Sequence, residues 1–476
     1  MKAAAHCDRT LVWATLLLVL IGMLTVYTAS VHVAHYSFGA SDVFLKRNAL
    51  RALFGMAAMG FAYSIDYRSY RKHAKRAILL AIGLLVATLV FGQTIRGMRA
   101  QLLMFQPGEI AKLVLVFYLA DVLARRHEEL SSFVRGLLPR LVIAGVVVGL
   151  ILLQPDFGNA VAVVVLSLVI LFLGGARLAH IGGLGLAAVP GFILAVRIVP
   201  HIAERWAVWM ASFDLTLEGL DTRGAGYQIY QSLVALGSGG VLGRGLGASL
   251  QRAFIPDPYT DFAFSIWGEE FGFIGAVAVV GIFALLMSRG LRIARRAPDR
   301  YGTILAGGLT AMVTVYAVIN IGVATALIPT TGLPLPFVSY GGSSLIVNMA
   351  AIGVLLNMSK RGTPARASLP GRSGRAPAAR VEKAQTARRG GEDRQGGSSR
   401  PAARTTKARS SASPEAAART TKARSSAPPK AAARTTRTRS SAPSKATART
   451  TKTRQGTPSK AGARPPKAGA TKRKRS

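Results

Sequence analysis

The sequence has almost no cysteine and little negative charge. Its 476 residues include one cysteine, Cys7, which excludes a disulfide framework and a metal site built from cysteines. Acidic residues number 21 against 60 lysines and arginines, and the formal net charge is +39. The shortage is greatest in residues 360–476, where 4 acidic residues accompany 32 basic ones and aromatic residues are absent. The chain therefore consists of two parts that must be interpreted separately.

Residues 360–476 have the composition of a disordered segment. Residues 401–454 repeat every 15 residues, so that ARTTKARSS begins at Ala403 and again at Ala418. Ala, Pro, Ser, Thr, Lys and Arg cannot build a hydrophobic core, so we predict a disordered cytoplasmic tail. It could bind anionic lipid, nucleic acid or an acidic protein, or remain solvated without a specific partner. Anionic lipid is favoured over nucleic acid, because the tail leaves the membrane at Lys360 and has no aromatic side chains to stack on bases.

Residues 1–359 are dominated by apolar runs. A helix needs about 20 residues to cross a hydrocarbon layer of about 30 Å. Ten runs approach or exceed that length, and the first is interpreted as an uncleaved signal-anchor. The predicted spans are 11–30, 49–65, 76–93, 109–124, 140–154, 159–175, 178–199, 262–287, 303–327 and 339–358. We therefore predict an all-α, polytopic membrane domain with about ten transmembrane helices in residues 1–359, followed by the tail.

The basic residues between these spans predict the orientation. Segments on the side of the N-terminus carry 17 lysines and arginines, and segments on the other side carry 10 spread over more residues. Because positive loops remain in the cytoplasm, both termini are expected there. The long segment 200–261 is then expected outside.

The segment from Gln251 to Gly275, QRAFIPDPYTDFAFSIWGEEFGFIG, places carboxylates at the mouth of an apolar helix. Carboxylates at a bilayer boundary are costly unless they pair, face a cavity or perform chemistry. We assign the chemistry to Asp261, and capping of the helix start is the alternative. Glu269 and Glu270 lie about two turns deeper and need partners, for which the outer arginines or Lys112 are candidates.

Further polar residues fall on the predicted outer side. Glu109 and Lys112 are three residues apart, so on a helix they share a face and could pair. One interpretation is an ion pair that neutralises itself, and the other is that Lys112, with Arg96 or Arg99, binds an anionic head group such as a pyrophosphate. Glu109, Glu269 and Glu270 are also assigned to substrate binding, as are Arg205, Gln251, Ser339 and Ser343.

The glycine-rich run from Gly237 to Gly247, GSGGVLGRGLG, does not fit a nucleotide-binding loop. No strand precedes it, no Walker lysine follows it, and it lies on the predicted outer side. Two interpretations stay open. The run could be a tight loop that lets the backbone approach a substrate, or it could be a purely structural turn.

Four motifs carry a family resemblance. PYTDFAFSIWGEEFGFIG resembles the PEPHTDFIFAVIGEELGFIG sequence of the SEDS family, the shape, elongation, division and sporulation proteins that include RodA and FtsW. GRGLGASLQ, QPGEIAK with QPDFG, and LIPTTGLPLPFVSYGGSS resemble the same family in the same order. The resemblance covers nearly all of residues 10–360, and the GRGLGASLQ and PTTGLPLPF segments look more like FtsW than RodA. The chain departs from the family pattern at Gly108, at Met98 to Ala100, at Asp257 and at Tyr259.

The resemblance implies a ten-span glycosyltransferase of the bacterial inner membrane that polymerises lipid II into peptidoglycan during septal wall synthesis and cell division. Asp261 matches the family's catalytic aspartate, and the reaction inverts the donor's anomeric carbon. The implied partners are a class B penicillin-binding protein, which is a transpeptidase, and other division proteins. The alternatives are a lipid II flippase and a RodA-type elongation polymerase. No spaced ligand set specifies a metal, although a divalent cation near the pyrophosphate stays an open alternative.

Overall fold

The computed structural model describes residues 7–95, 98–102, 105–125, 132–213 and 225–360. The predicted disordered tail and the lipid or nucleic-acid binding assigned to it lie outside the described residues. So does Arg96.

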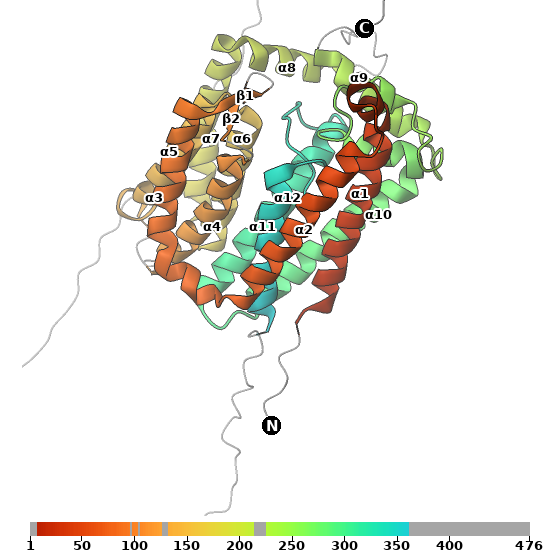
Figure 1. Cartoon of the computed structure of the whole chain (residues 1–476). Helices are drawn as coiled ribbons and strands as arrows, with labels where there is room; N and C mark the ends of the chain where they lie inside the picture. Colours follow the sequence, from red (N-terminus) through yellow and green to blue (C-terminus); the bar gives the residue numbers. More distant parts are fainter. Residues whose placement is uncertain (1–6, 96–97, 103–104, 126–131, 214–224, 361–476) are drawn as a thin grey trace, which may run out of the picture. The chain divides into compact units, whose positions relative to one another are not determined.

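Each of the ten predicted spans coincides with a helix (Figure 1). They are α1 (Arg9–Phe38), α2 (Val43–Ser64), α3 (Tyr67–Phe91), α4 (Pro107–Arg125), α5 (Leu138–Leu153), α6 (Phe157–Leu173), α7 (Leu178–Ile198), α10 (Ala263–Arg295), α11 (Arg300–Ala324) and α12 (Gly342–Ser359). The prediction of an all-α, multi-pass membrane protein is confirmed.

The number of membrane crossings is less sharply defined than the number of helices. Within the described residues, six helices are both long and apolar enough to cross a membrane, namely α1, α3, α7, α10, α11 and α12. Helices α5 and α6 are apolar but shorter. Helix α2 carries Lys46, Arg47 and Arg51, and α4 carries charged residues at both of its ends. These charged residues lower the mean hydropathy of α2 and α4, and neither helix is therefore among the six.

Two helices were not predicted. α8 (Pro200–Ala211) and α9 (Ala225–Ser238) lie in the segment expected outside, and both are shorter than the helices of the ten predicted spans. The short pieces are β1 (Gln93–Ile95), which pairs antiparallel with β2 (Met98–Gln101), the π-helical turn η2 (Phe133–Leu137), and the 3-10 turn η3 (Gln251–Ala253). Helix α8, β1 and β2 lie at the end of the helices opposite the start of α1 (Figure 1). We call it the α8 end, and we call the opposite one the N-terminal end.

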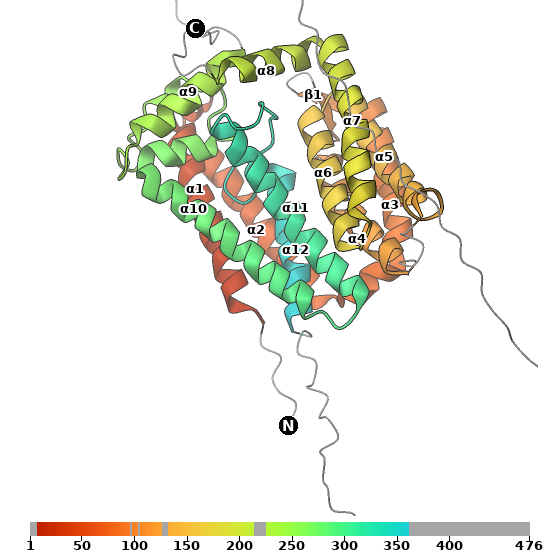
Figure 2. The same cartoon turned by 180° about the vertical axis from the view of Figure 1, so that it is seen from behind.

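Helices α11 and α12 form the interior of the membrane domain. Most of their residues are buried, whereas no residue of α7 is buried. α12 packs along α2, and α11 packs against α10, α4 and α6 (Figures 1 and 2). Small residues allow this close packing, because a Cβ on Gly353 would lie 2.2 Å from the carbonyl oxygen of Met59. The loop between α11 and α12 is thereby held next to the start of α10.

Candidate active site

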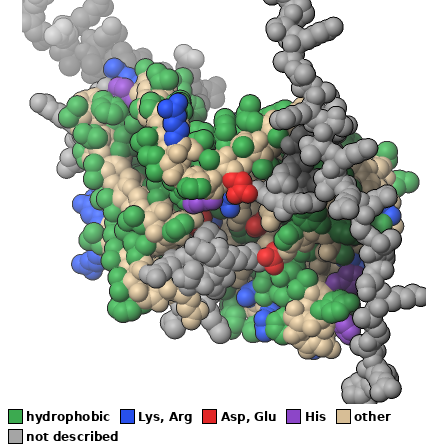
Figure 3. Space-filling view, turned by 90° about the horizontal axis from the view of Figure 1, so that it is seen from above, with side chains coloured by type: hydrophobic (Ala, Val, Ile, Leu, Met, Phe, Trp, Pro, Cys, Tyr) green, Lys and Arg blue, Asp and Glu red, His purple; other side chains and the backbone are tan. Residues whose placement is uncertain are grey.

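Asp261 lies at the α8 end, in the turn that precedes α10. The helix begins at Ala263 and its N-cap position is Phe262, so Asp261 does not occupy the cap itself. Its side chain is half-buried. The side chains of Glu109, Glu269 and Glu270 are buried. Seen from above, acidic side chains gather near the middle of this end, surrounded by hydrophobic ones (Figure 3).

A buried amide fixes the backbone at Asp261. The Nδ2 group of Asn320 donates to the carbonyl oxygen of Asp261 at 2.8 Å and to that of Leu333 at 2.7 Å. Gly332 has a φ of +74°, and a Cβ there would lie 3.9 Å from Oδ2 of Asp261. The PTTGLPLPF loop and the segment before α10 therefore meet at the Asp261 carboxylate. Sequence reasoning missed Asn320, although an amide inside the apolar run of α11 was a visible signal.

Tyr259, one of the departures from the family pattern, is part of an aromatic cluster. Its ring centroid lies 4.7 Å from that of Phe44 and 5.6 Å from that of Tyr340. The Tyr340 backbone N–H donates to the Tyr259 carbonyl oxygen at 2.8 Å. The cluster ties the turn before α10 to the start of α2 and to the loop before α12.

Glu269 binds the segment that follows the glycine-rich run. Its carboxylate accepts the hydroxyl of Ser249 at 2.5 Å and the backbone N–H groups of Leu250 at 3.0 Å and Gln251 at 3.2 Å. Nε of Arg244, one of the arginines on the predicted outer side, lies 4.0 Å from Oε1 of Glu269. An outer arginine is thus among the partners of Glu269, as proposed from the sequence, and the hydroxyl and amide donors are partners that the sequence did not indicate. Gln251 enters the site through its backbone.

Glu270 connects α10 to α1. Its Oε2 accepts the hydroxyl of Thr28 at 3.1 Å, and Nη1 of Arg252 donates to the Thr28 carbonyl oxygen at 3.1 Å. Arg252 thus lies near this carboxylate without forming a direct hydrogen bond to it among the described contacts. Glu270 also accepts the backbone N–H of Gly247, and no sequence pattern indicated either partner.

Part of the glycine-rich run packs closely against α10. A Cβ on Gly239 would lie 2.2 Å from the Gly268 carbonyl oxygen, and one on Gly243 would lie 2.2 Å from that of Glu270. Gly272 interrupts α10 with a φ of 65° and a ψ of −164°, and the next N–H group, that of Phe273, donates to Gly240. Of the two interpretations of this run, the structure supports close packing of the chain on itself.

Glu109 and Lys112 form the pair that their spacing predicts. Nζ of Lys112 lies 2.6 Å from Oε2 of Glu109, and the two side chains are 1% and 3% exposed. The ammonium also lies 3.7 Å from the ring centroid of Tyr316. Lys112 is therefore enclosed, and in this conformation its ammonium does not reach the surface where a head group would lie.

A polar network surrounds that pair. The hydroxyl of Tyr316 donates to Oδ1 of Asn159 at 2.5 Å, and Asn159 donates to both carboxylate oxygens of Asp156. Burial raises the pKa of the Asp156 carboxyl, and the hydrogen bonds from Asn159 act in the opposite direction. Asn159 and Tyr316 were not among the predicted site residues.

The remaining predicted residues fix loops to one another. Nη1 of Arg205 in α8 donates to the Thr330 carbonyl oxygen at 3.2 Å. Ser339 accepts the N–H of Leu335 at 3.0 Å, and Ser343 accepts that of Gln106 at 2.9 Å.

Arg99 lies in β2, and its side chain is outside the described part. Within the described residues, no group of three or more His, Cys, Asp or Glu side chains could hold a metal ion.

The sequence model of the FtsW/RodA/SpoVE family, described as cell cycle protein, matches residues 9–363. Stage V sporulation protein E of Bacillus subtilis (strain 168) is 41% identical, and the match covers 74% of this chain and 97% of the relative. The probable peptidoglycan glycosyltransferase FtsW of Geobacter sp. (strain M18) is 38% identical over 76% of this chain and 99% of the relative.

A chain from a solved peptidoglycan synthase complex, studied for its coordination of polymerization and crosslinking, superposes with a TM-score of 0.61. It is 28% identical, and the match covers 75% of this chain and 98% of that one. The order of the helices is consistent with these likenesses. So is the position of the four motifs, which all lie at the α8 end. The chain belongs to the FtsW/RodA/SpoVE family of cell cycle proteins, the SEDS family.

Proposed function

We propose that this chain polymerises lipid II into the glycan strands of peptidoglycan, during septal wall synthesis and cell division. The chain is a peptidoglycan glycosyltransferase embedded in the membrane, as its relatives' names and its family membership support. A RodA-type role in elongation is the alternative within the same activity. The polymerising domain is residues 1–359, and residues 360–476 form an appended tail.

The observation that carries the proposal is the accessibility of Asp261. The side chains of Glu109, Glu269 and Glu270 are buried. Asp261 is half-buried, and its backbone is anchored by Asn320. A general base must reach the proton that it removes, so a partly exposed carboxylate on a fixed backbone suits that task.

The reaction follows from the chemistry of the substrate. An acceptor sugar hydroxyl attacks the donor's anomeric carbon, Asp261 takes the hydroxyl proton, and the bond to the lipid-linked pyrophosphate breaks. One displacement converts the α linkage of the donor into a β linkage, so the reaction inverts that centre. The leaving pyrophosphate needs cationic partners. We assign these to Arg96 and Arg99, with Lys112 available only if its pair with Glu109 opens.

The proposed placement puts the α8 end outside the bacterial inner membrane and both termini in the cytoplasm. The distribution of basic residues supports this orientation, because positive loops stay in the cytoplasm. We further propose a class B penicillin-binding protein as the transpeptidase partner. The likeness to a chain of a complex that couples polymerization and crosslinking supports this partner.

The test is polymerisation of purified lipid II by the full-length protein in liposomes, with and without the transpeptidase. Asp261→Asn should insert normally and make no glycan. Asp257→Asn is the matched control, because Asp257 is a half-buried carboxylate of the same segment; it should retain most of the activity. Polymerisation by Asp261→Asn would refute the assignment of the base. Lipid II supplied on the outer face alone must yield polymer, whereas transport without polymer would favour the flippase.

A further inference from the structure

A basic pocket lies at the N-terminal end, remote from Asp261. It has a volume of about 450 Å³ and forms where α3, α4 and the start of α11 meet. A pocket of this size can hold a small ligand or a lipid head group. Its lining residues are Arg68, Arg71, Lys72, Arg125, Asp299 and Tyr301. Four cations therefore face one carboxylate.

Asp121 holds two of these arginines in position. Its Oδ1 accepts Nε of Arg71 at 2.9 Å and Nε of Arg125 at 2.7 Å, and its side chain is 1% exposed. Both guanidiniums are partly exposed. Each is a planar fork with donors on two edges, and the contact with Asp121 uses the Nε edge. The terminal N–H groups lie on the other edge, and the two arginines carry one positive charge more than Asp121 neutralises.

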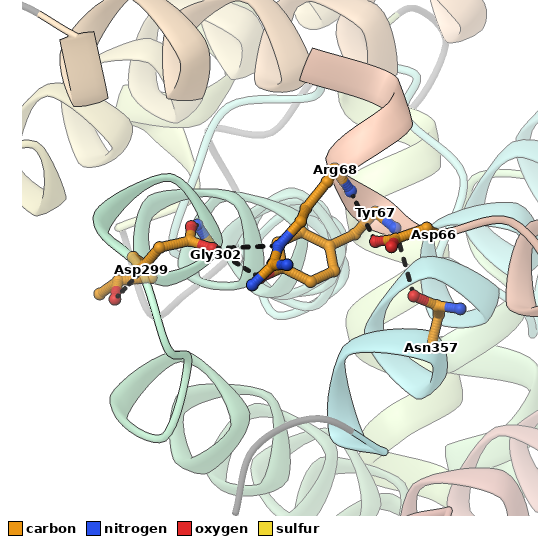
Figure 4. Close-up of polar contacts among 7 residues, drawn as sticks. Asp66, Tyr67, Arg68, Asp299, Gly302 and Asn357 are labelled. Atoms are coloured by element: carbon orange, nitrogen blue, oxygen red, sulfur yellow. Dashed lines mark hydrogen bonds and ion pairs between the residues drawn. The ribbon is translucent and has the colours of Figure 1, made fainter. Parts of the chain in front are cut away.

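Asp299 is engaged mainly by other groups. Its Oδ1 caps α11 by accepting the N–H of Gly302 at 2.7 Å, and its Oδ2 accepts the hydroxyl of Tyr67 at 2.7 Å (Figure 4). Nε of Arg68 lies 3.6 Å from Oδ2, and the Arg68 side chain is 56% exposed. Such a long, exposed ion pair contributes little. Arg68 and the exposed Lys72 thus add positive charge that Asp299 neutralises only weakly.

A buried hydroxyl in the pocket gives an independent indication of a ligand. Tyr301 is 1% exposed, its ring stacks on that of Tyr67, and it lines the pocket. Among the described residues its hydroxyl has no hydrogen-bond partner. Buried hydroxyls are normally paired, so an acceptor from outside the chain is expected here. A phosphate oxygen would accept this O–H together with the N–H donors of the arginines.

The surface of α3 identifies the source of the phosphate. Arg68, Lys72 and Lys75 follow one another along one stripe of the helix, because they are three to four residues apart. The same stripe continues into Leu79 and Val90, whose side chains are 66% and 64% exposed. A basic start followed by an exposed apolar stripe matches an amphiphile with an anionic head and an acyl chain. A free phosphate ion would contact only the basic start of this stripe.

We infer that this pocket binds the head group of an anionic phospholipid of the cytoplasmic leaflet, with an acyl chain along the stripe of α3. The four cations bind the phosphate, Tyr301 donates its hydroxyl, and the lipid joins α3, α4 and α11. Binding to the folded state alone raises the unfolding temperature once the lipid concentration exceeds the dissociation constant, and the temperature then rises with the logarithm of that concentration.

The test measures the unfolding temperature of the full-length protein in a neutral detergent. Short-chain phosphatidylglycerol, short-chain phosphatidylcholine and inorganic phosphate are each titrated at constant ionic strength. Phosphatidylglycerol should raise the temperature from a threshold concentration near its dissociation constant. Arg68→Gln/Lys72→Gln should move that threshold to a roughly tenfold higher concentration, since two charged contacts are lost. Tyr301→Phe should weaken binding while keeping the pocket's charge.

Arg292→Gln/Arg295→Gln is the matched control. It removes two exposed charges from the last turns of α10 and leaves the pocket and the tail unchanged. This control should respond to phosphatidylglycerol like the wild type. An equal loss in the control would mean that the effect is nonspecific attraction and would overturn the site. An equal response to phosphatidylcholine, or to inorganic phosphate alone, would reject the anionic lipid as its ligand.

Discussion

Lys112 and Glu109 form a buried ion pair at the start of α4, with Nζ and Oε2 separated by 2.6 Å. The ring of Tyr316 from α11 covers the ammonium. A buried pair need not stabilise the fold as a whole, because both charges are desolvated. Removing one partner is a different case, since it leaves the other charge buried and uncompensated.

This difference gives a double-mutant prediction. Glu109→Gln and Lys112→Met should each lower the free energy of unfolding by about 3–5 kcal/mol. The double variant should lose less than the sum of the two, because it leaves no buried charge. Reversible unfolding in mixed micelles measures all three. Additive losses would show that the residues do not act as a pair.

The sequence was sufficient to predict ten of the helices and this pair, since both depend on local spacing. Apolar runs set the ten helices, and the i, i+3 spacing set the contact between Glu109 and Lys112. The cover by Tyr316 was not predictable, because it depends on how α11 packs against α4. Amphipathic connectors such as α8 lack long apolar runs, and the search for spans therefore missed them.

The sequence singled out carboxylates of the candidate site but did not indicate their contacts. Asp261 and Glu269 were both singled out because carboxylates beside an apolar helix need an explanation. Their surroundings separate them: Glu269 binds Ser249 and two backbone N–H groups, whereas Asp261 stays half-buried. Those donors belong to a loop whose path depends on glycines packed against α10. Spacing along the sequence does not reveal such a path.

The glycine-rich run offers a graded test of that packing. Gly237 lies in α9 with open space around it, so Gly237→Ala should be neutral or stabilising by up to about 1 kcal/mol. Gly240 has a φ of +54° and open space, so Gly240→Ala should cost about 1–2 kcal/mol. Gly243 combines a φ of +86° with a 2.2 Å approach to the Glu270 carbonyl oxygen, so Gly243→Ala should cost about 3 kcal/mol or more.

Unfolding measurements on the three variants test this order. Gly243→Ala should also reduce polymerisation, because the loop that it displaces carries the donors to Glu269. If Gly243→Ala were as stable as Gly237→Ala, the close approach to α10 would not exist in solution.

Asp156 and Asp42 should show pH effects of opposite sign. Burial raises the pKa of Asp156, so the folded state holds its proton more tightly than the unfolded chain. Its contribution to stability is complete below the unfolded pKa of about 4 and is lost as the pH rises through the folded value. A hydrogen bond from Lys46 lowers the pKa of Asp42, so its contribution is present above about pH 4 and is lost as the pH falls further.

The unfolding temperature of the wild type, compared with Asp156→Asn and Asp42→Asn between about pH 7 and pH 3, separates the two effects. Relative to Asp156→Asn, the wild type should become more stable as the pH falls toward about 4. Relative to Asp42→Asn, it should become less stable below about pH 4, and only slightly, because the pair with Lys46 is exposed. Since each variant removes one titrating group, groups that do not interact with it cancel in each comparison. A difference from Asp156→Asn that does not change with pH would mean that this carboxylate is hydrated rather than enclosed between α5 and α6.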